Sequence, residues 1–467
     1  MMPLTLKPAA LAVLTLALAG CASLVPPTDS PQPPLRESFR AEGVAAEAAL
    51  GDAAIANEWD GFFSDERLRN VVGLALSGNR SLRASVAAVE RVRAQYGITE
   101  ANRSPELRGT AAVSRQGGDA TTTSNSYSVS LGVAAWEIDL FNRLGSLQGA
   151  ALSRYLAQQE TQRGARLSVV AQVADAWLTL AAENQRLLLA EGLRDSQQKS
   201  LNLIERQYQL GAVSGLQQAR AQTAFEAARG EAARTAAAVR QTRLALELLA
   251  GQPLPDALLP SGQIGQATAL PALPGGLPAT VLLQRPDLRA AEQLLQAASF
   301  DVGAARAARF PRLTLTANTG VRSPEVDNLF RGGNSFWSLL PSLDLPIFDA
   351  GARRAQVDVT EATRRELIAN YEAALQTAFR ETADALTVRD SLTERMAAQQ
   401  AQVEAATRSL NIAEQSYRLG ASSQLELLDA QRQLTAAQLG LVALRQTEQS
   451  NRVLLLRVLG GRWTAGG

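Results

Sequence analysis

Two long stretches of the chain keep the spacing of apolar residues that is typical of helices. Neither residues 142–209 nor residues 352–419 contain a proline. Apolar residues recur in the first stretch at intervals of three and four: Leu167, Val170, Val173, Trp177 and Leu180. At a rise of about 1.5 Å per residue, each stretch predicts a helix of roughly 100 Å. Helices of this length form a coiled-coil rod or, laid side by side, a tube.

Alternating apolar and small polar residues predict two short strands before each long helix. Leu313, Leu315 and Ala317 alternate with Thr314 and Thr316. Around residue 130, apolar residues alternate with serine and glycine in the same way: Tyr127, Val129, Leu131, Val133 and Ala135. Such a strand suits the boundary between lipid and a watery lumen, but a half-buried strand of a soluble sheet alternates too.

Aromatic residues near the strand ends favour the membrane interpretation, because aromatic girdles mark membrane interfaces. They are Tyr127, Trp136, Phe310 and Trp337. Four strands cannot close a barrel, which needs about eight, and open edges cannot face lipid. Strands that span a membrane therefore require several chains in one barrel; two chains supply about eight strands and three about twelve.

The N-terminus reads as an export signal with a lipidation site. Lys7 precedes an apolar run from Ala9 to Ala19 that is too short to span a bilayer. Leu18-Ala19-Gly20-Cys21 resembles a bacterial lipobox, in which the cysteine is lipidated and becomes the mature N-terminus. The alternative is a short signal peptide with an incidental cysteine. In lipoproteins of this kind an aspartate after the cysteine retains the protein at the inner membrane, so Ala22 predicts the outer membrane.

The chain is an internal duplication. Ser81–Leu107 aligns without gaps to Asp287–Leu313 at an offset of 206, and a second block around Glu205 aligns at an offset of 209. Each half therefore predicts the same order: a helix near Ser64–Asn102 or Gln284–Ala308, two strands, and two long helices joined by a glycine turn.

These features give six segments. They are a signal peptide (1–20), a lipidated N-terminus and extended tether (21–58), a first repeat (59–251), a Pro/Gly-rich connector (252–283), a second repeat (284–461) and a C-terminal tail (462–467). The predicted fold class is mainly α with a small β part: a long α-helical barrel plus four strands of a shared transmembrane β-barrel, internally duplicated.

Composition removes several functions. The 467 residues carry a net charge of +1, no histidine and one cysteine. A balanced charge gives no general attraction to nucleic acid, and the chain has no histidine for Ser-His or Cys-His triads or for Cys/His zinc sites. A carboxylate-pair hydrolase remains conceivable, but no compact pocket-forming domain is visible. We expect no catalytic residue, no cofactor and no metal site.

Two motifs resemble the outer-membrane efflux factors. These are the TolC-like channels, and the chain is similar to their lipoprotein branch (NodT- and OprM-like). The motifs are Arg285-Pro286-Asp287-Leu288-Arg289-Ala290-Ala291-Glu292 and Tyr417-Arg418-Leu419-Gly420 followed by Leu427-Leu428-Asp429-Ala430-Gln431-Arg432. The resemblance covers nearly all of the mature chain. It implies a homotrimer with a twelve-stranded outer-membrane barrel and a twelve-helix periplasmic tunnel, working without a cofactor beside a periplasmic adaptor protein and an inner-membrane transporter.

Two turns are the predicted docking tips for the adaptor. In each half the long helices meet at a Leu-Gly-Ala element, whose glycine permits a positive-φ helix stop. The elements are Leu210, Gly211 and Ala212, and Leu419, Gly420 and Ala421. They follow the long helices, at the end far from the strands, and the resemblance implies that such tips contact the adaptor.

A periplasmic gate is expected just past the second tip. Glu426 and Asp429 share a helix face, and the resemblance places them where acidic rings constrict the family's channel. Like charges held close repel one another and attract cations; the plain alternative is two solvated carboxylates. Tyr417 matches a tyrosine that ties closed tips together, and Arg220, aligned with Asp429 by the repeat, is a candidate gating partner. A gating arginine of the family is replaced by Ser422, so different bonds must hold this gate.

The predicted function is the gated outer-membrane channel of a tripartite efflux pump, lipid-anchored in the outer membrane and extending into the periplasm. One alternative is a periplasmic coiled-coil lipoprotein without a pore. Another is an outer-membrane conduit for type I protein secretion. The sequence does not separate drugs from metal ions as cargo.

Overall fold

The computed structural model describes residues 24–27, 39, 61–118, 121–261, 267–268 and 279–461. The predicted signal peptide, Cys21 and most of the tether lie outside the described residues. The chain divides into two compact units. Unit 1 comprises residues 1–33, 87–160 and 289–374, and unit 2 comprises residues 34–86, 161–288 and 375–467.

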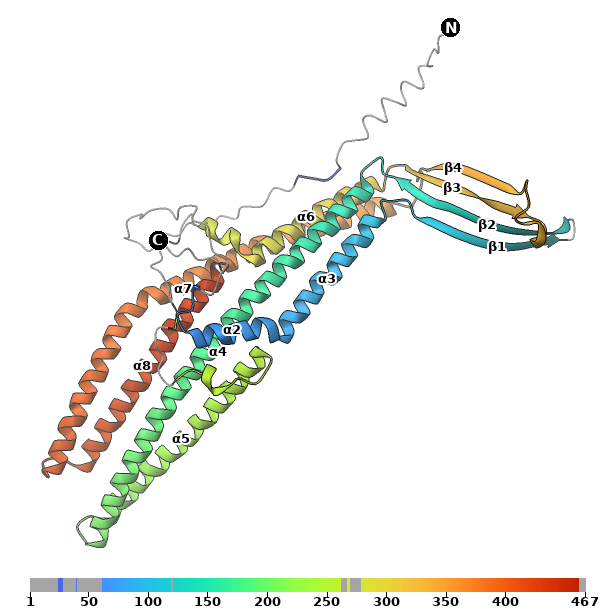
Figure 1. Cartoon of the computed structure of the whole chain (residues 1–467). Coiled ribbons are helices and arrows are strands. Elements are labelled where there is room, and N and C mark those ends of the chain that lie inside the picture. The colour runs from blue at the N-terminus through green and yellow to red at the C-terminus, as the bar shows by residue number, and fades with distance from the viewer. Residues whose placement is uncertain are drawn as a thin grey trace. The chain divides into compact units, whose positions relative to one another are not determined.

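The two predicted long helices are confirmed. Helix α4 spans Arg143–Gln209 and helix α7 spans Ala352–Arg418, each with 67 residues. Each is followed by a shorter antiparallel partner, α5 (Gly215–Ala250) and α8 (Gln424–Val458). Figure 1 shows all four; residues 161–209 of α4 and 375–418 of α7 belong to unit 2, together with α5 and α8. Long helices of equal length reflect the duplication.

The single helix predicted near Ser64–Asn102 is wrong, because the structure has two helices there. Helix α2 (Glu66–Gly78) ends at Asn79, whose ψ of 124° is extended, and α3 (Arg80–Ala101) begins directly afterwards. The Asn79 side chain caps α3 by accepting from the backbone N–H of Leu82 at 3.0 Å. Its amide donates to the carbonyl of Leu249 in α5 at 2.8 Å, so tertiary bonding fixes the break. The counterpart α6 (Pro286–Ala307) is continuous.

The four predicted strands form one antiparallel sheet in the order β1-β2-β3-β4 (Figure 1). Their bounds are Leu107–Gly118, Thr121–Ile138, Arg312–Ser323 and Ser335–Asp344. The central pairing joins the two repeats, with Val129 opposite Val321 and Leu131 opposite Thr319. The predicted apolar side of β2 therefore continues onto β3.

The predicted alternation fails at Ala135. The register shifts between Val133 and Trp136, so that two residues of β2 face one residue of β3. Ala135 takes a positive φ of 47°, and its N–H donates to the hydroxyl of Thr316 at 3.1 Å. After this bulge Trp136, instead of Ala135, pairs with Leu315 and continues the apolar side.

In unit 2 the long helices form a single layer in the order α5-α4-α8-α7 (Figure 1). Helices α4 and α5 share a small apolar cluster. The amide of Gln197 in α4 donates to Gln431 in α8 at 2.8 Å, and Gln399 in α7 donates to the carbonyl of Ala437 in α8 at 2.9 Å. The outer helices α5 and α7 thus border the layer on its two sides.

Unit 1 has a layer of the same kind, in the order α3-α4-α6-α7. The rings of Tyr96 in α3 and Tyr155 in α4 stack with centroids 6.4 Å apart. Arg154 of α4 pairs with Asp301 of α6, and an arginine–glutamate ion pair of 2.9 Å joins α6 to α7.

Within unit 2 two helices begin where two others end. The α3 start lies beside the last turn of α5 through Asn79, as described above. Likewise Arg285, just before α6, donates to the carbonyl of Val458 at the end of α8 at 3.3 Å. A Cβ on Gly251 would lie 2.3 Å from the carbonyl oxygen of Gly78, so these ends touch closely enough to require glycine. At these junctions in unit 2, α3 begins beside the end of α5 and α6 begins beside the end of α8.

Candidate functional site

The sheet carries apolar side chains on surfaces that the single chain leaves open. Strand β1 is exposed along its whole length, and β4 is exposed except at Phe336. Large apolar side chains are among the exposed ones: Leu107, Val113, Leu131, Trp337, Leu339, Leu340 and Leu343. Many exposed, large apolar side chains on one sheet indicate contact with other protein or with lipid.

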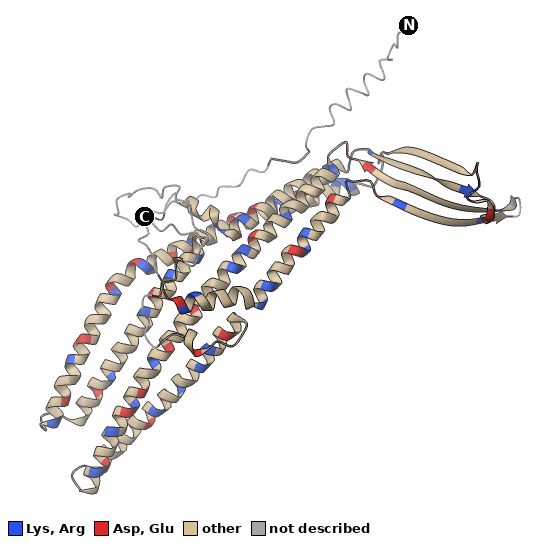
Figure 2. Cartoon of the chain, in the orientation of Figure 1, with Lys and Arg blue, Asp and Glu red and all other residues tan. Residues whose placement is uncertain are grey.

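The middle of the sheet carries no charge. The charged residues of the strands lie toward the strand ends, which Figure 2 shows by colour. They are Arg108, Arg115, Glu137, Arg312, Arg322 and Asp344. The uncharged run in β1 is the shortest, Gly109–Ser114, and at about 3.3 Å per residue it measures roughly 20 Å. A membrane-spanning strand has about 9–11 residues, so the uncharged run of β1 covers only part of a span, and the longer uncharged runs of β2, β3 and β4 cover more of it.

The sheet also has two open edges. In the described residues β1 pairs only with β2, and β4 pairs only with β3. Unpaired backbone N–H and C=O groups on a long edge must bond to water or to another strand, and in lipid only another strand is available. The edges thus define the surface through which this sheet can be extended.

Each predicted tip is a glycine-terminated helix end. Gly211 has a φ of 72° and Gly420 a φ of 73°. The N–H of Ala212 donates to Gln207 and the N–H of Ala421 to Ser416, both at 2.8 Å. These six-residue closures are Schellman motifs, which stop a helix at a left-handed residue. Leu210 and Leu419 beside the glycines are 83% and 84% exposed, which makes both tips apolar.

Glu426 has a structural role that the sequence interpretation missed. Its carboxylate accepts from the N–H of Ser423 at 2.8 Å, and the Ser423 hydroxyl accepts from the N–H of Glu426 at 3.3 Å. This is a capping box at the start of α8, and its signal was present in the sequence as Ser423-Gln424-Leu425-Glu426. The first repeat has the same box with Ser214 and a neutral Gln217.

Asp429 is exposed and bonded to its own helix. Its carboxylate pairs with Arg432 at 3.2 Å and accepts from the amide of Gln433 at 2.7 Å. Arg220 is exposed and, within the described part of this single chain, forms no ion pair with Asp429. Tyr417 is half-buried in the last turn before the second tip, where its carbonyl accepts from the N–H of Gly420 at 3.0 Å. Tyr417, Glu426 and Asp429 therefore lie around the second tip, whereas Arg220 lies in α5 just past the first tip.

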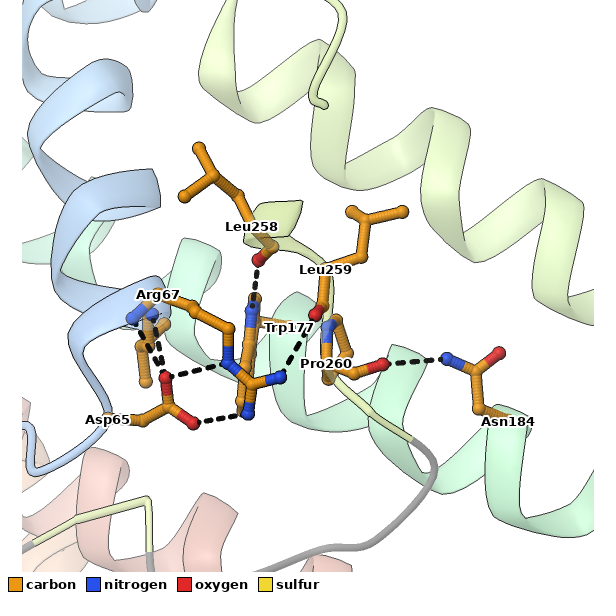
Figure 3. Close-up of polar contacts among 8 residues, drawn as sticks. Asp65, Arg67, Trp177, Asn184, Leu258, Leu259 and Pro260 are labelled. Carbon is orange, nitrogen blue, oxygen red and sulfur yellow. Dashed lines mark hydrogen bonds and ion pairs between the residues drawn. The ribbon is translucent and has the colours of Figure 1, made fainter. Parts of the chain in front are cut away.

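A polar cluster in unit 2 joins the connector to α4 and was not predicted (Figure 3). Asp65 pairs with Arg67 at 2.8 Å, and the Arg67 guanidinium lies 5.7 Å from the ring centre of Trp177. Arg67 and Trp177 donate to the carbonyls of Leu259 and Leu258 at 3.4 and 3.2 Å. Burial raises the pKa of Asp65, but the hydrogen bonds and charge of Arg67 outweigh burial and hold that pKa below its ordinary value. No local motif signals this cluster, because its members are far apart in sequence.

The arginine of the Arg-Pro-Asp motif, Arg285, bonds to three helices. The Arg285 side chain is 10% exposed and pairs at 2.8 Å with both Asp287 and Glu381 of α7. Burial raises the pKa of Asp287, but the bonds to Arg285 outweigh burial and leave that pKa below its ordinary value. With its bond to the end of α8, Arg285 holds three helices together and thus serves structure.

None of the helices that the structure describes combines the length and apolarity needed to cross a membrane.

Comparisons with known proteins agree on one family. A model described as outer membrane efflux protein matches residues 71–252 and 277–461. The toluene efflux pump outer membrane protein TtgC of Pseudomonas putida is 37% identical over 462 residues, which cover 97% of this chain and 95% of that protein. The cation efflux system protein CusC of Escherichia coli is 35% identical over 455 residues, covering 96% and 97%. The crystal structure of the open state of the MtrE outer membrane channel of Neisseria gonorrhoeae has a TM-score of 0.85 at 34% identity, covering 94% and 98%.

Proposed function

The chain belongs to the outer membrane efflux protein family, and we propose that three copies of it form the outer-membrane channel of a tripartite efflux pump. Its relatives are channel and transport proteins of the outer membrane. In this proposal the channel receives cargo from an inner-membrane transporter and a periplasmic adaptor protein. The chain itself forms the conduit and catalyses no reaction.

The observation that carries the proposal is the open sheet, whose charged residues lie toward the strand ends. Four strands with two free edges can be satisfied in lipid only by closure with other copies. Three copies supply about twelve strands, which is enough to enclose an aqueous pore. The polar faces of Ser128, Ser130 and Asn318 would then line that pore, and the apolar faces would contact lipid.

The helical layers support closure in the same way. Each layer is one helix thick and bordered by helices that lack a neighbour on one side. Leu244 and Leu248 on the border helix α5 are 64% and 79% exposed. Burying such apolar surface against α7 of the next copy is favourable by about 25 cal/mol for each Å². Three layers joined in this manner would make a tunnel.

Membrane attachment by a lipid on Cys21 is part of the proposal. The apolar run ends at this cysteine, which is the only one in the chain. The polar interval after it provides a tether. Labelling of growing cells with radioactive palmitate tests this, and a Cys21→Ser chain is the control that must remain unlabelled.

We place the gate at the second tip, with Glu426 and Asp429 repeated three times around one axis. Both side chains are exposed in the single chain, so their charges are available to a pore. Tyr417 lies on the preceding helix end. Arg220 of a neighbouring copy is a partner for Asp429, since no residue of the same chain bonds Arg220 in the described structure.

The gate is tested with neutral variants that keep the helix caps. Glu426→Gln retains the capping box, because Gln217 makes the same box in the first repeat. We expect the Glu426→Gln, Asp429→Asn double variant to raise single-channel conductance in planar bilayers severalfold and to weaken cation preference, because three pairs of repelling carboxylates disappear.

A matched control removes a carboxylate that is not at the tip. Glu231→Gln on α5 lies outside the proposed ring and should leave conductance unchanged. If the double variant and the control conduct alike, the gate assignment is wrong. If the unmodified protein does not conduct at all, the channel function itself fails.

The tips are the proposed docking sites of the adaptor. Exposed Leu210 and Leu419 offer apolar contacts beside glycines that fix the turn. The two tips differ in charge, since Glu426 in the second replaces neutral Gln217 in the first. One adaptor surface must therefore accept two related but unequal tips.

A further inference from the structure

A short segment near the N-terminus lies on the helices of unit 1. Residues Leu24–Pro27 contact α6 and α7. The guanidinium of Arg306 donates to the carbonyl of Leu24 at 3.3 Å, and that of Arg364 donates to the carbonyl of Pro27 at 2.8 Å. Both bonds hold the main chain of the segment, so they fix its path independently of its side chains.

Gly303 makes room for this segment. A Cβ built on Gly303 would lie 2.5 Å from the Cγ2 atom of Val25 and 3.2 Å from the Cα atom of Val25. No real Cβ approaches another carbon as closely as 2.5 Å, so a larger residue must shift the Val25 side chain and press on the main chain of the segment. Glycine inside a helix is unfavourable by about 0.5–1 kcal/mol relative to alanine; at position 303 it leaves the space that Val25 fills.

The two arginines also have partners on the helices of unit 1. Arg306 pairs with Glu361 at 2.9 Å, and Arg364 donates to the hydroxyl of Ser299 at 3.1 Å. Groups fixed by their own helices lose little side-chain freedom when they bind a further acceptor. The two guanidinium groups are thus positioned by partners on α6 and α7 as well as by the segment.

The first repeat has no such site. The offsets of 206 and 209 align Gly303 with Gly97, Arg306 with Glu100, and Arg364 with Tyr155. Nothing lies within 4 Å of a Cβ on Gly97. Tyr155 stacks on its neighbour Tyr96, whose hydroxyl donates to Glu100 at 3.2 Å. The two arginines are therefore specific to the second repeat and are not part of the duplicated pattern.

We propose that Gly303, Arg306 and Arg364 form a docking seat for residues 24–27, and that this seat fixes the lipid-bearing end of the chain beside the strands of its own subunit. The lipid part rests on the proposed lipidation of Cys21. Two residues separate Cys21 from Leu24, so the three steps along the chain reach at most about 10 Å. Gly303 lies one turn before the end of α6, and β3 begins five residues after that end. The seat therefore sets the level at which the acyl chains enter the bilayer.

The first test measures whether Val25 is covered, independently of the lipid. Cys21 is the only native cysteine, so a Cys21→Ser, Val25→Cys chain carries a single thiol. Adding Arg364→Ala should speed modification of that thiol by a polyethylene-glycol maleimide about tenfold, because local release exposes the segment. Adding Arg365→Ala is the matched control and should leave the rate unchanged, and equal rates in the two variants would overturn docking at the seat.

The second test follows the lipid. Thermolysin cuts before Leu24 and Val25 when these residues are free, which separates a palmitate label from the chain. In outer membranes, Gly303→Val and Arg364→Ala should each lose the label about tenfold faster than the unmodified protein, because local release exposes the segment. Gly97→Val and Arg365→Ala are the controls and should match the unmodified protein.

The outcomes separate the two proposals. Palmitate that never labels the unmodified protein refutes lipid anchoring and with it the lipid-positioning part of the inference, while modification of the thiol at position 25 still decides on the seat. A labelled protein in which Gly303→Val and Gly97→Val lose the label equally fast refutes the seat and leaves the channel untouched.

Discussion

At the scale of single residues, local motifs were readable and distant partners were not. The helix-stopping glycines at 211 and 420 adopt the positive φ that the sequence predicted. The Ser423–Glu426 capping box was equally readable and was overlooked in favour of a gate role for Glu426. By contrast, Arg67 and Trp177 meet only because α2 and α4 pack together, and no spacing rule predicts that contact.

Arg67→Ala should destabilise unit 2 at neutral pH by about 1–2 kcal/mol, as expected for a lost cation–π contact and a partly exposed ion pair. The pKa of Asp65 is lowered in the folded protein, so its contribution is present above its ordinary value of 3.8 and is lost as the pH falls through the lowered value. Thermal unfolding in detergent, scanned over pH, should therefore show a Tm difference from the unmodified protein that shrinks in acid. Arg83→Ala, an exposed arginine of α3, serves as the control.

At the scale of elements, uninterrupted patterns were predicted best. The absence of proline and the steady apolar spacing were enough for α4 and α7. The break at Asn79 was not predictable, because the local pattern continues as a helix and the deciding bond comes from Leu249, 170 residues away. The β2 bulge was missed because Ala134 and Ala135 give no local signal, and the hydroxyl that stabilises it belongs to another strand.

Gly211→Ala should loosen the first tip, because a left-handed alanine costs roughly 1–2 kcal/mol. Hydrogen exchange of the amides around residues 206–214 should accelerate accordingly. Gly215→Ala in the same tip is the matched control: Gly215 begins α5 without a positive φ, and an added Cβ meets Tyr208 only at an ordinary 3.8 Å. Equal exchange in the two variants would show that the turn does not depend on glycine.

At the scale of the whole molecule, the sequence predicted what the chain cannot do alone. The predicted strand count alone calls for further copies of the chain, and the structure adds open sheet edges and border helices with exposed leucines. The sequence does not predict which polar groups meet across copies, because Arg220 and Asp429 do not pair within the described part of one chain. Gate bonds between subunits have no signature in a single sequence.

Leu248→Glu should shift the oligomer toward monomers, because it places a charge where we propose that α5 meets the next copy. Leu188→Glu on α4 is the control. Leu188 is 60% exposed, like Leu248 at 79%, but α4 already has a helix on both sides. Mass measurement of the detergent-solubilised protein should give trimers for Leu188→Glu and dissociation for Leu248→Glu. Trimers of equal stability in both variants would contradict the proposed border contact.

The end-to-end helix pairs have a mechanical consequence. Where α5 gives way to α3 and α8 to α6, no backbone hydrogen-bond ladder crosses from one helix to the next, whereas α4 and α7 run through unbroken. Bending or twisting of the helical layer can therefore concentrate at these junctions, where side-chain hydrogen bonds such as those of Asn79 and Arg285 break before a helix does. Because α4 and α7 are continuous while α5 and α8 end at the junctions, a subunit can bend there and keep its backbone hydrogen bonds intact.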